Sequence, residues 1–170
     1  MLAHSYTGIE ATPVGSEGDG CGAANGYLMH ARYALSEHDG CIAEARHRAV
    51  AFLTKAQVDR HLPVPPRARD LTQLVVSELV TNARKYAPGP VLLELCINAR
   101  AVDVVVWDSD PTVPVARAAD PDRIGQHGLE VVRAVTEALF IEQELVGKRI
   151  TARIALSGGP GGHATSTHPS

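Results

Sequence analysis

A carboxylate and an amide lie on a face of a predicted helix that begins as apolar. Residues 67–86 have helical periodicity, and at roughly 100° per residue Glu78 and Asn82 fall within the apolar stripe. The apolar members of this stripe are Leu71, Leu74, Val75 and Leu79. Lys85 continues the same line, so the face becomes polar toward its C-terminal end. Either this end of the helix leaves the core and is solvated, or its polar groups line a pocket.

A second acid ends a run of residues that is typical of a β-strand. Three alternate positions share one face of this run, and they are Val102, Val104 and Val106. Asp108 extends that face where the run ends. Its carboxylate either points to the core side of the sheet or caps the turn that follows.

A pair of glycines, Gly125 and Gly128, precedes a further helical segment. The unpaired N–H groups and the positive dipole end of a helix N-terminus can hold a phosphate. The spacing G-x-x-G is also found in ordinary glycine-rich turns. Phosphate binding and a simple turn therefore remain alternatives.

Three helices and four or five strands must position these residues. The helices are expected over residues 42–58, 67–86 and 128–138. The strands are expected over residues 26–35, 91–98, 102–108, 139–145 and 148–156. In the last hairpin, alternation places Leu145 opposite Lys148. The predicted class is α+β, a mixed and mostly antiparallel sheet that three helices cover on one face.

Composition predicts one domain with two glycine-rich tails. The chain has 170 residues, of which 45% are hydrophobic and 21% charged, as in ordinary globular proteins. Ten of the 15 glycines fall in residues 1–26 and 157–170, which are expected to be flexible tails. All 16 Lys and Arg lie within residues 27–156 together with 16 acids, so this domain has no net charge. Direct binding to nucleic acid or to an anionic membrane is therefore disfavoured.

The N-terminus has neither a basic start nor an apolar stretch, so a cytoplasmic location is expected. Three cysteines, Cys21, Cys41 and Cys96, predict neither a disulfide framework nor a metal site. A metal-binding protein is a further alternative, although its candidate ligands have no spacing typical of a metal site. Those ligands are His4, His30, His38, Cys41, His47, His163 and His168.

Three motifs in this order resemble a known family. They read Ser-Glu78-Leu-Val-Thr-Asn82-Ala, Val-Val-Val-Trp-Asp108 and Gly125-Gln-His-Gly128-Leu129-Glu-Val-Val132. They resemble the GHKL ATPases, which have the Bergerat fold of gyrase and histidine kinases. Within this group, the chain is more similar to the stand-alone branch of anti-sigma regulatory factors and serine kinases. The resemblance covers residues 27–156.

The resemblance implies ATP and Mg²⁺ as cofactors. It implies that Asn82 coordinates Mg²⁺, that Asp108 accepts a hydrogen bond from the adenine amino group, and that Glu78 orients or deprotonates the nucleophile. The glycine motif would close over the phosphates through Gly125, His127, Gly128 and Leu129. Lys85 would contact a phosphate, and residues 109–127 would form a mobile lid.

The sequence departs from the family pattern at two positions. The family usually has Asp-x-Gly where this chain has Asp108-Ser-Asp110-Pro111. Relatives often have threonine after Gly-Lys, whereas this chain has Gly147-Lys-Arg149-Ile-Thr151. Thr151 is the candidate replacement for that hydroxyl.

The resemblance implies an ATP-binding anti-sigma regulatory factor that acts in a partner switch. Such a protein binds a sigma factor and phosphorylates serine or threonine on a STAS-type antagonist, and it can form a homodimer. The alternative is a catalytically inactive module, gated by nucleotide or free of it, that sequesters a regulatory protein. The two differ in whether the γ-phosphoryl group is transferred.

Overall fold

The computed structural model describes residues 26–86, 89–110 and 126–157. The tails, Gly125 and most of the expected lid lie outside these residues. The elements in chain order are β1 (Met29–Leu35), α1 (Cys41–Arg60), α2 (Pro66–Tyr86), β2 (Val91–Ile97), β3 (Ala101–Asp108), α3 (Gln126–Val135), β4 (Ala138–Gln143) and β5 (Lys148–Ala155). None of the helices in these ranges is long and apolar enough to cross a membrane.

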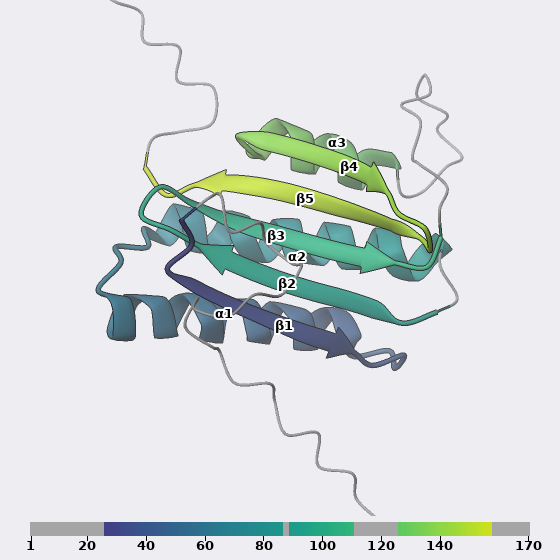
Figure 1. The fold of residues 1–170 in the computed structure, drawn as a ribbon, viewed down its shortest axis with the longest axis horizontal. Helices are drawn as coiled ribbons and strands as arrows, with labels where there is room; N and C mark the ends of the chain where they lie inside the picture. Colours follow the sequence, from purple (N-terminus) through teal and green to yellow (C-terminus); the bar gives the residue numbers. More distant parts are fainter. Residues whose placement is uncertain (1–25, 87–88, 111–125, 158–170) are drawn as a thin grey trace, which may run out of the picture.

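The five strands form one sheet in the order β1-β2-β3-β5-β4, and every neighbouring pair is antiparallel (Figure 1). The last strand, β5, is therefore inserted between β3 and β4. This arrangement confirms the α+β class. The sheet is antiparallel throughout rather than mixed, since each strand runs opposite to its neighbours. The connections that contain helices also return the chain in the antiparallel direction.

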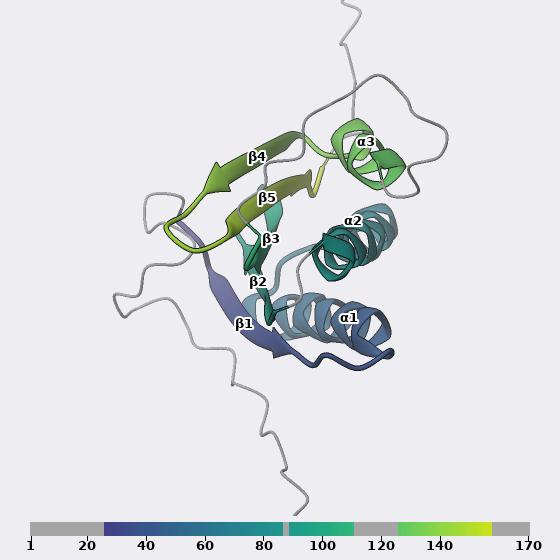
Figure 2. The same cartoon turned by 90° about the vertical axis from the view of Figure 1, so that its right-hand side faces the viewer.

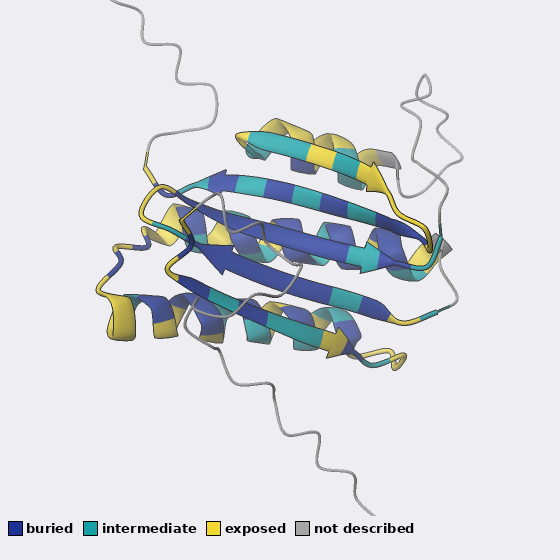
Figure 3. Cartoon of the chain, viewed as in Figure 1, coloured by how far each residue is buried: buried dark blue, intermediate teal, exposed yellow. Residues whose placement is uncertain are grey.

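All three helices cover one face of the sheet (Figure 2). The core lies between the two layers, and the central strands β2 and β3 are its most continuously buried part (Figure 3). On β3 the alternate residues Val102, Val104 and Val106 belong to this core, as period-two alternation predicts. On β5 the corresponding buried positions are Lys148, Ile150, Ala152 and Ile154. A lysine thus occupies the first core-facing position of an otherwise apolar series.

The buried face of α2 is rotated from the predicted stripe. Leu74, expected in the stripe, is 37% exposed, and Leu71 is only partly buried. The buried positions are instead Ala68, Thr72, Val75, Val76, Leu79, Val80, Asn82 and Ala83. The reason is that α2 packs on the sheet between α1 and α3, so its contacts cover a wider arc than one apolar stripe marks.

The register of the last hairpin also differs from the prediction. Gln143, not Leu145, lies opposite Lys148, and Leu139 pairs with Ala152. The turn is longer than assumed: the Glu144 N–H donates to the Gly147 carbonyl at 3.1 Å, and Gly147 has a φ of 86°. A shift of two residues leaves every side chain on its predicted face, which explains why alternation did not reveal the error.

Gly147 fixes this turn against the end of β3, and replacing it should destabilise the fold. A Cβ there would lie 1.8 Å from the Asp108 carbonyl oxygen, in a backbone conformation that L side chains rarely adopt. We expect Gly147→Ala to lower the free energy of unfolding by on the order of 2 kcal/mol or more in chemical denaturation.

Gly40→Ala is the matched control. A Cβ at Gly40 would meet nothing within 4 Å, and its φ is −86°. We expect a change of less than about 1 kcal/mol. Equal losses from the two substitutions would contradict the close approach of Gly147 to β3.

Candidate functional site

Four elements meet at one end of the sheet, where β3 ends and β5 begins. Because these strands are antiparallel, Asp108 at the end of β3 lies directly opposite Lys148 at the start of β5. The C-terminal end of α2 and the N-terminal end of α3 reach the same end of the molecule, at the right in Figure 1. Segments far apart in sequence therefore supply one set of polar side chains.

Glu78 lies against the first turn of α3. A Cβ built on Gly128 would be 2.5 Å from Glu78 Oε2, so any other residue here would require the Glu78 carboxylate to move. The α2 position of Glu78 is half-buried, at the rim of the core. The carboxylate is thus held next to a helix N-terminus, whose free N–H groups favour negative charge.

Asn82 follows one turn later on α2 and is only 6% exposed. Within the described part of the chain, its Oδ1 atom is buried without a hydrogen-bond partner. Leaving such an oxygen unsatisfied costs about 1–3 kcal/mol. An unpaired buried amide oxygen is the type of ligand that a hard cation such as Mg²⁺ takes, so Asn82 fits the metal role that the resemblance implies.

Asp108 and Lys148 form a buried ion pair on the helix-covered face. The Lys148 Nζ atom lies 3.1 Å from Asp108 Oδ1, and each side chain is at most 2% exposed. The Asp110 N–H also donates to Asp108 Oδ1 at 2.9 Å, and Lys148 Nζ donates to the Asp110 carbonyl at 3.2 Å. Asp108 therefore caps the following turn and faces the core side at once, so both interpretations of this acid hold.

Lys148 was not predicted as a site residue, although the sequence contains a signal for it. Lys148 starts the period-two series that continues with Ile150 and Ala152. A charged residue in the core-facing phase of a strand needs a partner, and Asp108 is the acid at the same sheet end.

Thr151 is not brought to this cluster. It lies opposite Val105 on β3 and alternates with the buried residues of β5, which puts it on the sheet face that carries no helices. Lys148, three residues earlier, lies on the other face. The hydroxyl expected near Asp108 is therefore replaced in space by the Lys148 ammonium.

The remaining predicted site residues lie on α2 and α3, apart from Gly125. His127 is exposed in the first turn of α3, with its Nδ1 atom 3.7 Å from Glu130 Oε2. Leu129 is partly buried against the core, and Lys85 is exposed in the last turn of α2. Gly125 lies outside the described residues. The structure thus places Glu78 against Gly128, with Asn82 one turn further along α2, and it pairs Asp108 with Lys148.

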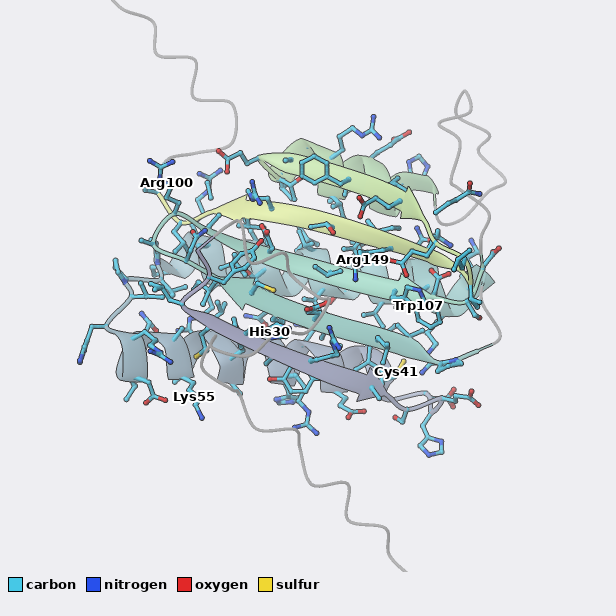
Figure 4. The ribbon with its side chains drawn as sticks, in the orientation of Figure 1. His30, Cys41, Lys55, Arg100, Trp107 and Arg149 are labelled. Atoms are coloured by element: carbon cyan, nitrogen blue, oxygen red, sulfur yellow. The ribbon has the colours of Figure 1, made fainter. Side chains whose placement is uncertain are left out.

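The opposite face of the sheet carries a separate pocket of about 570 Å³. Trp107 and Arg149, which are register partners, lie on this face with the helices behind the sheet (Figure 4). The other lining residues are Arg32, Leu92, Glu94, Val105, Glu144, Leu145 and Val146. The sheet separates this pocket from Glu78 and Asn82, so it does not contribute to the cluster.

The same face carries a buried charge network and a group of metal-ligand types. Arg153 donates two hydrogen bonds to Asp103, at 2.9 and 3.1 Å, and these bonds raise the pKa of the guanidinium. The ligand atoms of His30, Glu94 and Cys96 lie within 4.8 Å of one another. Cys96 is disulfide-bonded, which corrects the expectation that the cysteines form no disulfide.

Comparison with known families agrees with the fold. Residues 41–154, about two thirds of the chain, match the histidine kinase-like ATPase domain. The chain therefore belongs to the histidine kinase-like ATPase family, an ATP-binding class. No curated protein matches the chain. Family membership confirms the GHKL part of the resemblance, and its finer branch stays a prediction.

The unpaired oxygen of Asn82 predicts an unusual stability result. Because Oδ1 is buried without a partner, Asn82→Leu should leave the free energy of unfolding of the nucleotide-free protein unchanged or raise it by about 1 kcal/mol. Asp103→Asn is the matched control, since this buried polar side chain has two partners, Tyr27 and Arg153. It should lose on the order of 1–3 kcal/mol. A larger loss at Asn82 than at Asp103 would contradict an orphaned amide.

Proposed function

We propose that this chain is a Mg²⁺- and ATP-dependent regulator that phosphorylates serine or threonine on a STAS-type antagonist and binds a sigma factor in a partner switch. The observation that carries the proposal is the pairing of Glu78, held against Gly128, with the orphaned oxygen of Asn82 one turn away. One helix face thus offers a proton acceptor and a metal ligand side by side. A solvated helix end would need neither.

Asn82 and Glu78 have different roles in the proposed phosphoryl transfer. When bound, Mg·ATP would supply the γ-phosphoryl group, and its metal ion would neutralise the charge that develops during transfer. Asn82 would hold the metal through Oδ1, and the first turn of α3, beginning at Gln126, would offer backbone N–H groups to the phosphates. Asp108 accepts the hydrogen bond of the base.

Glu78 acts on the nucleophile. With Mg·ATP bound, the partner hydroxyl oxygen would form a bond to the γ-phosphorus as the bond to the β-γ bridging oxygen breaks, with ADP as the leaving group. Glu78 accepts the hydroxyl proton, directly or through one water. Gly128 leaves space for the Glu78 carboxylate in this position, since a Cβ there would lie 2.5 Å from Oε2.

A sequestering module without transfer is the second candidate. The observation that favours it is the departure from the family pattern at Asp108-Ser-Asp110, where a second acid stands in place of the usual glycine near the base. Both candidates bind a regulatory protein, and they differ in phosphoryl transfer.

Magnesium-dependent binding of ATP can be measured by thermal unfolding. A ligand that binds only the folded state raises the free energy of unfolding, by about 2.7 kcal/mol at one hundred times its Kd. The melting temperature rises as a result. We expect Mg-ATP to raise it in wild type and Asn82→Ala to lose most of the Mg²⁺-dependent part. Thr81→Ala, at an exposed neighbouring position on α2, should keep it. No shift in wild type at millimolar Mg-ATP would argue against a nucleotide-dependent function.

Glu78→Gln separates binding from transfer. The amide keeps the shape but removes the basic carboxylate, so Mg-ATP affinity should stay nearly unchanged. The single-turnover rate of labelled phosphate transfer to a STAS-type antagonist should fall about 10²-fold or more. Glu142→Gln, at an exposed position on β4, should transfer at the wild-type rate.

Two outcomes would change the proposal. Full transfer by Glu78→Gln would make Glu78 a structural residue. Binding of ATP by wild type without transfer to any antagonist would leave the sequestering module.

A further inference from the structure

The Lys148 ammonium has one hydrogen-bond donor to spare. An ammonium carries three donors, and those of Lys148 reach Asp108 Oδ1 at 3.1 Å and the Asp110 carbonyl at 3.2 Å. No acceptor for the third donor is found in residues 26–86, 89–110 or 126–157. The residue is 1% exposed, and a buried charged donor is costly unless it is fully paired.

Asp108 has a spare acceptor next to that donor. The hydrogen bonds that it accepts from Lys148 and from the Asp110 N–H both go to Oδ1. The Asp108 Oδ2 atom accepts no hydrogen bond from the residues that the structure describes. The ion pair therefore presents one acceptor and one donor side by side at the end of β3.

A purely structural role explains this pair poorly. Lys148 lies in a core-facing series with Ile150 and Ala152, where an apolar side chain of similar size would pack without desolvating a charge. Replacement of buried ion pairs by apolar residues is often neutral or stabilising. The pair is therefore better explained by a ligand that uses both of its groups.

The edges of the two purines differ in the groups that they present. Adenine offers an amino donor at position 6 and an acceptor at N1, whereas guanine offers an acceptor at O6 and a donor at N1. A carboxylate alone offers only acceptors, so it suits the adenine amino group and repels the guanine O6 atom. A carboxylate beside an ammonium can satisfy either edge.

We infer that Lys148 is a specificity-determining residue which, together with Asp108, lets the base site take guanine as well as adenine. The nucleotide class of the protein is then purine nucleoside triphosphates rather than ATP alone. This inference rests on the proposed function in one respect, the assignment of Asp108 to the base.

Isothermal titration of the full chain with Mg-ATP, Mg-GTP and, as a pyrimidine control, Mg-CTP tests the inference. Wild type should bind ATP and GTP with Kd values within about tenfold of each other, and CTP more weakly than both. Lys148→Met removes the donor and keeps the length of the side chain. It should weaken GTP binding by about 10- to 100-fold relative to ATP, because the O6 atom then faces the carboxylate alone.

Arg149→Met is the matched control, since Arg149 is the next residue of β5 and its side chain lies on the opposite face of the sheet. It should leave the ratio of the ATP and GTP affinities unchanged. The comparison of ATP with GTP in wild type needs no variant, so it decides the question even where Lys148→Met does not fold.

Three results would overturn the inference. Wild type that binds ATP and rejects GTP by 100-fold or more overturns it and leaves the proposed function intact. A ratio that Lys148→Met does not change overturns the role of Lys148. Binding of neither nucleotide by wild type overturns the proposed function itself and the inference with it.

Discussion

The antiparallel pairing of β3 with β5 is the contact on which the candidate site depends. It places Asp108 opposite Lys148, two residues that are 40 positions apart in the chain. It also sets the β4–β5 turn, through Gly147, against the backbone of Asp108 and Ser109. Because α3 leads into β4, the same pairing holds α3 beside α2, where Gly128 meets Glu78. A local change in this register would therefore separate Asp108 from Lys148.

The buried polar groups of Asn82 and Lys148 lower the stability of the fold at the candidate ligand site. The Asn82 oxygen is buried without a described partner, and Lys148 carries its charge into a core of apolar side chains. Each feature costs free energy that an apolar residue would not, and natural proteins concentrate such costs at functional positions. The rest of the helix-covered face shows the opposite pattern, because the core there is formed mainly by apolar residues of β2, β3, α1 and α2. The contrast locates the site within an otherwise ordinary core.

The sequence predicted the elements and the fold class well, because periodicity and the proline and glycine breaks are local signals. It also placed Glu78 and Asn82 on one helix face. Features that depend on non-local contacts were not predicted correctly. The buried arc of α2 depends on the helices and strands that pack against it. The register of the last hairpin depends on the turn that ends at Gly147. Lys148 was missed because its partner is set by strand pairing. Thr151 could have been placed on the other face from its spacing alone, since residues three apart on a strand point in opposite directions.

Amide chemical-shift mapping by ¹H–¹⁵N NMR during titration with Mg-ATP tests the central claim most directly, since it reports where on the chain nucleotide binds. The account predicts that, among the described residues, the largest changes fall at the joined ends of α2, β3, α3 and β5, at Asn82, Asp108, Gly128 and Lys148. The largest changes in the pocket on the opposite face of the sheet, at Leu92, Val105 and Trp107, would contradict it.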